Sequence, residues 1–381
     1  MNLLYLHNTP LNAAKANIIQ VLHMCDAFAR LGAEVTLALP EGTYKLTPAE
    51  IRGLIESRLN RQPGFRVAFF RKATPFGRLK SLGGFAGAYR FLKKTKTDLC
   101  LVRTPFFRLT TGLGIPTILE SHNTRLNFRY RLADRYWKRQ LMKRIDSPHF
   151  LKMVTISHAL GRFWREYGVP EEKLLVAHDG VDPSEFVPEI SRTAARQALE
   201  LPLEPRIVVY AGSLYPDREI ETVLELAVLH PEALFIVIGG PEKRKQVYEK
   251  IAAQENVENI SFVGYIPHVA VRDYLFAADV LLMIWSRKVR TIHICSPLKM
   301  FEYMAAGRVI VGHDFPVIRE VVDEDTAYLA DPDSPVDLHA RLNAALDEPF
   351  PSARASRARK KVLKDYTWEQ RARSILASVG M

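Results

Sequence analysis

Residues Ser296 to Gly307 carry the strongest pattern of chemically useful side chains. Pro297 suits the first turn of a helix, and Lys299 and Glu302 then share one side of that helix near its start. The free N–H groups of a helix start favour an anion such as a diphosphate. Lys299 would add a charge-assisted contact, and Glu302 would accept hydrogen bonds from the two hydroxyls of a ribose. An ordinary capped helix with a surface Lys–Glu pair explains the same residues equally well.

Two glycine turns follow apolar segments in the same half of the chain. Gly212 and Ser213 follow one segment, with Arg218 shortly after them, and Gly239-Gly240 follows another. Glycine lets the backbone approach a ligand closely, and an arginine can bind a phosphate through two hydrogen bonds. A plain strand-to-helix turn with a solvated arginine is the alternative. The chain has neither a G-x-G-x-x-G fingerprint nor a G-x-x-x-x-G-K-[ST] phosphate loop.

In the first half, His122 and Asn123 follow an apolar segment that ends at Glu120. A histidine there could contact a sugar hydroxyl or position an acceptor, although a structural histidine bonded to a carbonyl is the alternative. The loop after the first apolar segment is polar and includes Asn12 and Lys15. The chain contains no H-E-x-x-H or C-x-x-C pattern and no Ser/His/Asp order, so hydrolase and zinc chemistry have little support and we expect no metal.

These residues follow apolar segments that alternate with helical patterns along the whole chain. Near-continuous apolar strands separated by amphipathic helices predict parallel sheets covered on both faces, and a turn-rich boundary near Asp182 predicts two such doubly wound α/β domains. Ligands bind at the carboxyl ends of the strands in this fold. The expected strands are Leu3–Leu6, Glu34–Leu39, Arg66–Phe70, Asp98–Arg103, Pro116–Glu120, Met153–Ile156, Ile207–Ala211, Leu234–Ile238, Ile260–Val263, Val280–Ile284 and Val309–Val311.

Length and composition agree with two globular domains. The 381 residues are 48% hydrophobic and 25% charged, which argues against wholesale disorder. No window approaches the roughly 20 apolar residues of a spanning helix. The N-terminus does not show the basic and then apolar pattern of a signal peptide. The three cysteines are odd in number and widely spaced, which is typical of a reducing compartment, so we expect a cytoplasmic protein.

The positive charge of the chain lies in its first half. Residues 1–182 hold 29 Lys and Arg against 14 Asp and Glu, whereas residues 183–381 hold 24 against 28. Two basic segments with interleaved aromatics, Phe69–Lys96 and Thr124–Ile145, fit a peripheral position on an anionic membrane surface. A solvated face on a core-packed helix is the alternative. No recognised nucleic-acid module is present, so we expect no nucleic-acid partner.

These features, in this order, resemble the family 4 glycosyltransferases, which have two Rossmann-like domains in the GT-B fold. The resemblance spans nearly the whole chain and specifically includes the SPLK-FEYMAAG variant of the family motif. Further matching segments are Thr155–Leu160, His178–Asp182, Ile238–Pro241, Phe262–Tyr265 and Tyr366–Glu369.

The resemblance implies two domains. Residues 1–182 form an N-terminal acceptor-binding domain, and residues 183–367 form a nucleotide-sugar-binding domain. The last helix, about residues 368–381, crosses back to the first domain and belongs to it. It implies retaining transfer of a sugar from a nucleotide-sugar to a saccharide or lipid-linked acceptor, in surface polysaccharide or glycolipid synthesis, with no cofactor. We favour a UDP-sugar over a GDP-sugar.

The resemblance also assigns roles to individual residues. Glu302 matches the ribose-binding glutamate, Arg218 a phosphate-binding lysine, and His122 a histidine near the donor sugar. The expected catalytic residues are His122, Arg218 and Lys299, and the expected acceptor loops contain Asn12, Lys15 and Asn123. The expected nucleotide-sugar site comprises Gly212, Ser213, Arg218, Gly239, Gly240, Tyr265, Ser296, Pro297, Leu298, Lys299 and Glu302.

Three positions depart from the family pattern. Ile294 stands where the first glutamate of an E-x7-E pattern would lie, Ser213 stands where an arginine is usual, and Asn12-Ala13-Ala14 stands where a glycine pair is usual. Ile294 and Ser213 leave a catalytically weak family member as one alternative, and a nucleotide-sugar epimerase of the same fold is another.

Overall fold

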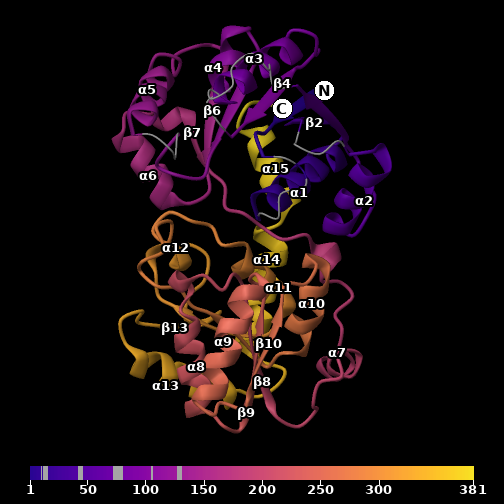
Figure 1. The fold of residues 1–381 in the computed structure, drawn as a ribbon. Coiled ribbons are helices and arrows are strands. Elements are labelled where there is room, and N and C mark those ends of the chain that lie inside the picture. Colours follow the sequence, from indigo (N-terminus) through magenta and orange to yellow (C-terminus); the bar gives the residue numbers. More distant parts are fainter. Residues whose placement is uncertain (10, 12–15, 42–45, 72–79, 104–105, 127–130) are drawn as a thin grey trace. The chain divides into compact units, whose positions relative to one another are not determined.

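The computed structural model describes residues 1–381 except 10, 12–15, 42–45, 72–79, 104–105 and 127–130. The chain forms two compact units, Met1–Asp179 with Trp368–Met381, and Gly180–Thr367 (Figure 1). The sequence analysis placed the boundary after residue 182, whereas the compact units divide after Asp179. Val181 belongs to the second unit because its N–H donates to the Tyr366 carbonyl (3.0 Å). Gly180 has no room for a side chain, since a Cβ there would lie 2.7 Å from the same oxygen.

The first unit is built on a seven-stranded parallel sheet with the strand order β3-β2-β1-β4-β5-β6-β7. The strands are β1 (Asn2–Leu6), β2 (Glu34–Pro40), β3 (Arg66–Phe70), β4 (Leu99–Val102), β5 (Thr117–Ser121), β6 (Phe150–Thr155) and β7 (Leu174–Val176). The helices are α1 (Ala16–Arg30), α2 (Pro48–Leu59), α3 (Lys80–Leu92), α4 (Phe107–Gly112), α5 (Arg131–Met142), α6 (His158–Glu166), the 3-10 turn η2 (Glu171–Lys173) and α15 (Trp368–Ala377).

The C-terminal helix α15 is part of the first unit, where it packs against α1. Trp368 is buried and stacks on His23 of α1 at 5.8 Å between ring centroids. Ala372 and Ile375 on the same side of α15 are fully buried. The helical spacing of these apolar residues therefore supplies the face by which the end of the chain joins the first sheet domain.

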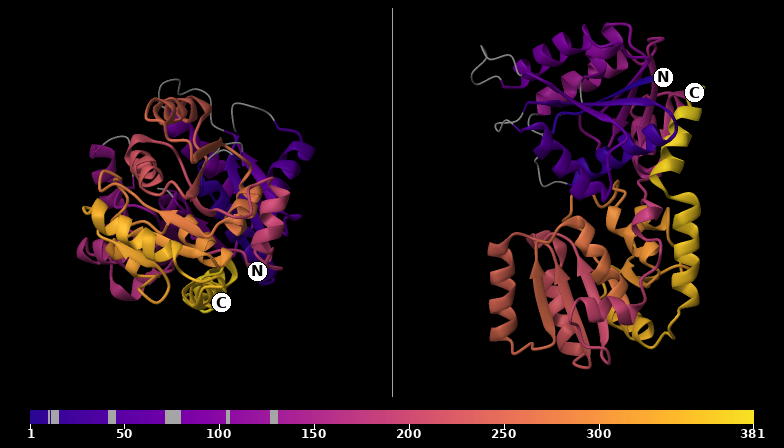
Figure 2. Two further views of the ribbon diagram at one scale, coloured as in Figure 1. Left: turned by 90° about the horizontal axis from the view of Figure 1, so that it is seen from below. Right: turned by 90° about the vertical axis from the view of Figure 1, so that its right-hand side faces the viewer.

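The second unit is built on a six-stranded parallel sheet with the order β10-β9-β8-β11-β12-β13, and helices lie on both faces of it (Figure 2). The strands are β8 (Arg206–Ala211), β9 (Ala233–Ile238), β10 (Ile260–Gly264), β11 (Val280–Met283), β12 (Val309–His313) and β13 (Tyr328–Ala330). The helices are η3 (Pro183–Glu185), α7 (Arg192–Ala198), η4 (Pro216–Arg218), α8 (Ile220–Leu229), α9 (Glu242–Gln254), α10 (His268–Ala277), α11 (Leu298–Ala306), α12 (Pro316–Arg319), α13 (Pro335–Leu346) and α14 (Ala353–Asp365).

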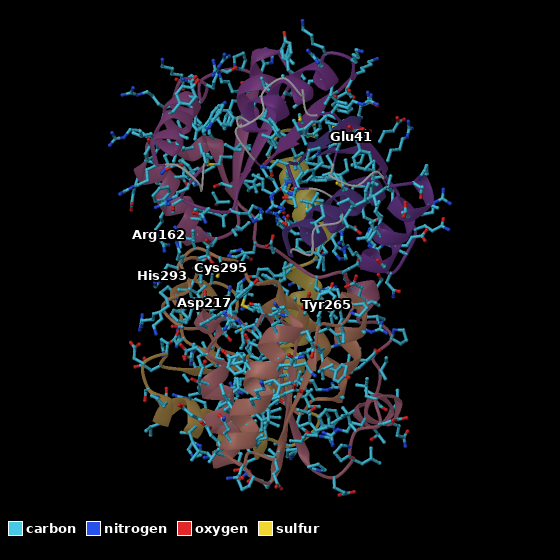
Figure 3. The ribbon with its side chains drawn as sticks, in the orientation of Figure 1. Glu41, Arg162, Asp217, Tyr265, His293 and Cys295 are labelled. Carbon is cyan, nitrogen blue, oxygen red and sulfur yellow. The ribbon has the colours of Figure 1, made fainter. Side chains whose placement is uncertain are left out.

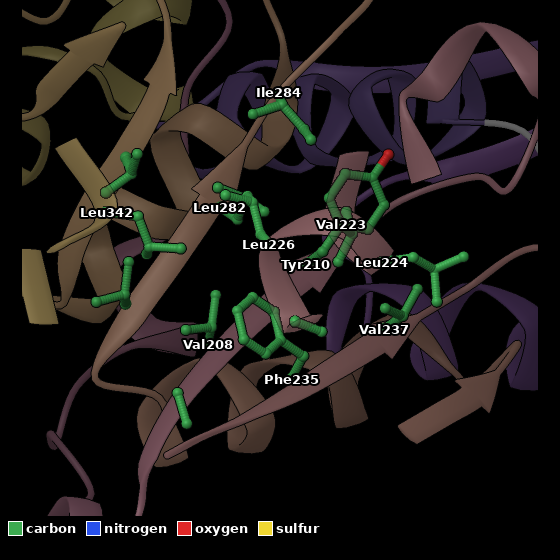
Figure 4. Packing of buried hydrophobic residues seen from close by; sticks show 14 of the residues in the cluster. Val208, Tyr210, Val223, Leu224, Leu226, Phe235, Val237, Leu282, Ile284 and Leu342 are labelled. Carbon is green, nitrogen blue, oxygen red and sulfur yellow. The ribbon is translucent and has the colours of Figure 1, made fainter. Parts of the chain in front are cut away.

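The core of the second unit forms where β8, β9 and β11 meet the helices that cover them (Figure 4). Val208, Phe235 and Leu282 come from these three strands, and Leu226 and Leu342 come from α8 and α13. Each such side chain contributes roughly 1.5–3 kcal/mol when it is fully buried. The expectation of two doubly wound α/β domains is confirmed. Among the helices that the structure describes, none combines the length and the hydropathy needed to cross a membrane.

Candidate functional site

Four glycines lie where the carboxyl ends of β8, β9 and β10 come together. Gly212 donates its N–H to the carbonyl of Ile238 (2.9 Å), and Gly239 donates to the carbonyl of Gly264 (2.7 Å). Gly239 has a φ of +110°, and a Cβ there would lie 2.2 Å from the carbonyl oxygen of Gly212. Gly240 is equally confined, since its Cβ would lie 2.4 Å from Leu214. The backbone turns can therefore approach one another only because these positions lack side chains.

Helix α11 begins beside the first of these turns. The helix begins one position later than the sequence predicted, so Pro297 is its N-cap residue, and the side chain of Pro297 donates or accepts no capping hydrogen bond. The hydroxyl of Tyr303 accepts a hydrogen bond from the N–H of Ala211 at the end of β8 (2.8 Å). This contact ties the middle of α11 to the end of β8, next to Gly212. Ser296 is buried just before the helix, and Leu298 is its first residue.

The ammonium group of Lys299 is buried between two aromatic rings. Its Nζ lies 4.2 Å from the ring centroid of Tyr210 and 4.9 Å from that of Trp285. No hydrogen-bond partner for Nζ exists among the residues that the structure describes. Burial, and secondly the charge of Arg218, lower the pKa of Lys299 to about 7, although Glu302 acts in the opposite direction.

Two further buried polar atoms beside Lys299 also have no hydrogen-bond partner within the described part of the chain. They are the Tyr210 hydroxyl and the Nε of Arg218. A Cβ added to Gly212 would lie 2.9 Å from the Tyr210 hydroxyl and 3.1 Å from Lys299 Nζ, so both line the same turn. Buried polar atoms are normally hydrogen-bonded in folded proteins. Nε of Arg218 lies 3.6 Å from Oδ1 of Asp217, which is an ion-pair contact but not a hydrogen bond. Two cationic side chains and a phenol whose buried polar atoms lack hydrogen bonds, beside the start of a helix, suit the binding of an anion.

Glu302 pairs with a histidine and not with Lys299. Its Oε1 lies 2.7 Å from Nε2 of His268, the first residue of α10. Burial disfavours the charged imidazole, but the carboxylates of Glu302 and Glu185 outweigh it and raise the pKa of His268 to about 9. Tyr265 lies in the turn between β10 and α10 and is 72% exposed (Figure 3). Ser213 lies in the turn after Gly212 and is partly exposed.

In the first unit, Glu120 is the centre of a buried polar cluster. It accepts hydrogen bonds from the Tyr5 hydroxyl, from Nε2 of Gln20 (2.7 Å) and from Nη2 of Arg371 (3.0 Å). His122 Nε2 lies 2.7 Å from Glu120 Oε1. Burial would raise the pKa of Glu120, but the Arg371 guanidinium, the hydrogen-bonded His122 imidazole and the Arg103 guanidinium hold it well below its usual range.

His122 is therefore placed as a neutral hydrogen-bonding group. Burial and the charge of Arg103 lower the pKa of His122, although Glu120 partly opposes them. Since the carboxylate of Glu120 only accepts hydrogen bonds, Nε2 of His122 carries the proton and Nδ1 is left as the acceptor. Asn123 is partly buried, and its carbonyl accepts a hydrogen bond from the Ser121 hydroxyl (3.0 Å). The predicted residues Asn12 and Lys15 lie outside the described residues.

The sequence analysis missed several residues of both clusters. Tyr210 and Trp285 lie at or just after the ends of β8 and β11, so an aromatic residue at a strand end was the available signal. His7 follows β1, and neither of its ring nitrogens has a hydrogen-bond partner among the described residues. Nothing in the sequence distinguished His268. Within the described residues, no group of three His, Cys, Asp or Glu could hold a metal ion.

Two family models match the chain. The model described as Glycosyltransferase Family 4 matches residues 19–185, and the model described as Glycosyl transferases group 1 matches residues 191–362. The two matches correspond to the first and second sheet domains.

Curated relatives match part of the chain. It is 28% identical over 226 residues to a D-inositol 3-phosphate glycosyltransferase of Streptomyces avermitilis. The matched stretch covers 55% of this chain and 47% of that protein. It is 42% identical over 69 residues to one of Mycobacterium leprae, 18% of this chain and 16% of that protein. The chain thus spans about half the length, or less, of these relatives.

Solved structures share the fold over the whole chain. A sucrose-phosphate synthase from Thermosynechococcus elongatus has a TM-score of 0.74 at 18% identity, covering 98% of this chain and 97% of that one. Anabaena Alr3699/HepE in complex with UDP and glucose has a TM-score of 0.73 at 15% identity, covering 99% of each chain. With both halves matched by family models, the chain belongs to the family 4, group 1 glycosyltransferases of GT-B fold.

Proposed function

We propose that this protein is a retaining glycosyltransferase that moves a sugar from a nucleoside diphosphate sugar to a saccharide or lipid-linked acceptor. The observation that carries this proposal is the buried Lys299 ammonium, which has no hydrogen-bond partner among the described residues and lies beside Arg218 in a family 4 glycosyltransferase. The diphosphate of the donor would be its missing counterion. Synthesis of a bacterial surface polysaccharide or glycolipid is the proposed setting.

The proposed role of this cluster is to stabilise the leaving group. Arg218, Lys299 and the N–H groups at the start of α11 bind the diphosphate, whose negative charge grows as the bond to the sugar breaks. Glu302 accepts hydrogen bonds from the ribose hydroxyls. The Gly239–Gly240 turn leaves room for the nucleotide, and Tyr265 is exposed beside it. A UDP-sugar is the proposed donor, because a structural neighbour was solved with UDP-glucose.

The proposed reaction forms two bonds and breaks two, because a proton moves together with the sugar. The acceptor oxygen bonds to the anomeric carbon on the face from which the diphosphate oxygen leaves, and the acceptor proton passes to that diphosphate oxygen. In this proposal, Nδ1 of His122 accepts a hydrogen bond from a hydroxyl of the transferred sugar or of the acceptor. No metal or other cofactor takes part in this proposal.

The test measures UDP affinity by calorimetry. Glu302→Ala and Arg218→Ala are expected to weaken binding at least about tenfold, which is the effect of losing one charged hydrogen bond. Lys243→Ala and Glu258→Ala remove the same charges from exposed positions of the second unit and serve as matched controls. Unchanged affinity in Glu302→Ala and Arg218→Ala would defeat the proposal.

Product analysis tests the reaction itself. With nucleotide-sugar and acceptor, NMR should show that the anomeric configuration of the donor is kept in the product. Conversion of the nucleotide-sugar without an acceptor would instead indicate an epimerase, and an inverted product would overturn the retaining mechanism.

Helix α5 supports a peripheral position at the cytoplasmic face of an anionic membrane. Arg131, Arg135 and Arg139 are exposed on it together with Leu132 (81% exposed) and Tyr136 (43% exposed). Cations and apolar side chains on one exposed face favour an anionic bilayer surface, at about 1 kcal/mol for each cation. Sedimentation with vesicles tests this, because Leu132→Glu with Arg135→Glu should reduce binding to anionic vesicles. Equal sedimentation with neutral and anionic vesicles would count against it.

A further inference from the structure

We propose that His268 is a positioning residue for Glu302: it holds the carboxylate in the orientation that binds the ribose and keeps it from neutralising Lys299. This inference rests on the proposed function. Nε2 of His268 lies 2.7 Å from Oε1 of Glu302, and the two side chains are 26% and 16% exposed. They come from α10 and α11, which pack against each other.

The contact engages only one of the two carboxylate oxygens. Oε1 faces His268, and no other hydrogen bond to the Glu302 carboxylate exists among the residues that the structure describes. A carboxylate can accept about four hydrogen bonds. Oε2 is therefore left for the ribose hydroxyls, while the bond at Oε1 restricts rotation of the carboxylate. Fixing a ligand-binding group before the ligand arrives reduces the entropy lost on binding.

The same contact explains why Lys299 has no counterion. Lys299 and Glu302 are three residues apart in α11, a spacing at which a Lys–Glu pair readily forms. In the described structure no ion pair joins them, and Glu302 pairs with His268 instead. The ammonium of Lys299 thus stays available for the diphosphate, and the carboxylate stays available for the ribose.

The charges around His268 favour this arrangement. Glu302 of α11 and Glu185 of η3 act on the imidazole and raise its pKa to about 9, against the effect of burial. On α10 itself, Arg272 donates to the Glu185 carbonyl (3.0 Å) and pairs with Asp273. At neutral pH His268 is therefore a cation that donates a charge-assisted hydrogen bond to Glu302.

The experiment compares His268→Ala and His268→Gln on two nucleotides, UDP and 2′,3′-dideoxy-UDP. The second nucleotide keeps the diphosphate and lacks both ribose hydroxyls. We expect His268→Ala to weaken UDP binding about tenfold and to change dideoxy-UDP binding less than about twofold, as in a double-mutant cycle. His268→Gln keeps an N–H donor near the position of Nε2, so it should recover most of the UDP affinity. In turnover assays, KM for the donor should rise while kcat stays nearly constant.

Controls separate positioning from folding. His339→Ala removes a histidine of α13 in the same unit and should leave both affinities unchanged. Equal losses of UDP and dideoxy-UDP affinity in His268→Ala, or no recovery in His268→Gln, would overturn the positioning role. If Glu302→Ala weakens UDP binding and His268→Ala does not, this inference alone fails. If Glu302→Ala has no effect, the proposed function fails.

Discussion

Arg371 of α15 donates a hydrogen bond from Nη2 to Oε1 of Glu120 on β5, 251 positions earlier in the chain, at 3.0 Å. The two side chains are 2% and 0% exposed. Nε of Arg371 also donates to the carbonyls of Ala177 (3.2 Å) and His178 (3.0 Å). One guanidinium therefore ties the C-terminal helix, the centre of the first sheet and the segment after β7 into one unit.

Arg371→Met should lower the free energy of unfolding of the first unit by about 3–5 kcal/mol, because it leaves Glu120 buried without its main counterion. Urea denaturation followed by tryptophan fluorescence measures this change. Arg373→Met is the matched control, since Arg373 is 59% exposed and pairs with Glu369 one helical turn away. Its expected change is below about 0.5 kcal/mol. Equal effects of the two substitutions would contradict the assigned role of Arg371.

Nucleotide binding should take up a proton at pH 8. The pKa of Lys299 is about 7 in this structure, so the group is mostly neutral at pH 8. A bound diphosphate favours the charged form and raises this pKa, and UDP affinity should therefore fall as the pH rises above 7. Calorimetry in buffers of different ionisation enthalpy counts the protons. Lys299→Arg stays charged at every pH and should reduce this uptake, whereas zero uptake by the unmodified protein would refute the prediction.

Gly239→Ala should weaken nucleotide binding and destabilise the second unit. The new Cβ would lie 2.2 Å from a backbone oxygen, at a residue whose φ is +110°. We expect a loss of about 1–3 kcal/mol or more. Gly53→Ala is the control, because Gly53 lies inside α2 with nothing within 4 Å of a Cβ. That substitution should stabilise the protein by about 0.5–1 kcal/mol. A soluble Gly239→Ala protein with unchanged thermal unfolding would show that the turn can relax.

Asp279→Leu should destabilise the second unit by about 3–5 kcal/mol. Asp279 precedes β11 and pairs with Arg192, Arg196 and Arg206, and Arg196 is only 2% exposed. Removal of the carboxylate leaves that guanidinium buried without a counterion. Asp279→Asn keeps hydrogen-bond acceptance and should lose less, and the exposed Asp325→Asn should lose almost nothing. Denaturant midpoints compare the three variants, and an Asp279→Leu protein as stable as the unmodified protein would contradict the role of this carboxylate as a counterion.

The central strands of both sheets could be predicted from the sequence, because a strand buried on both faces is a continuous run of apolar residues. The edge strands β7 (Leu174–Val176) and β13 (Tyr328–Ala330) were missed, since three residues are too few to show a period. Lys299 and Glu302 could also be predicted from the sequence, because their three-residue spacing places both side chains on one side of a helix.

Spacing left two arrangements open for that pair, an ordinary surface ion pair or two separate ligand-binding groups. The fold excludes the surface ion pair, because the packing of α10 against α11 brings His268 to Glu302, and β8 and the segment after β11 enclose Lys299 between Tyr210 and Trp285. The periodic spacing of apolar residues depends only on neighbouring positions, so it can be seen in the sequence. Which buried charge meets which partner depends on contacts between residues far apart in sequence, and those contacts exist only once the sheets and helices have packed.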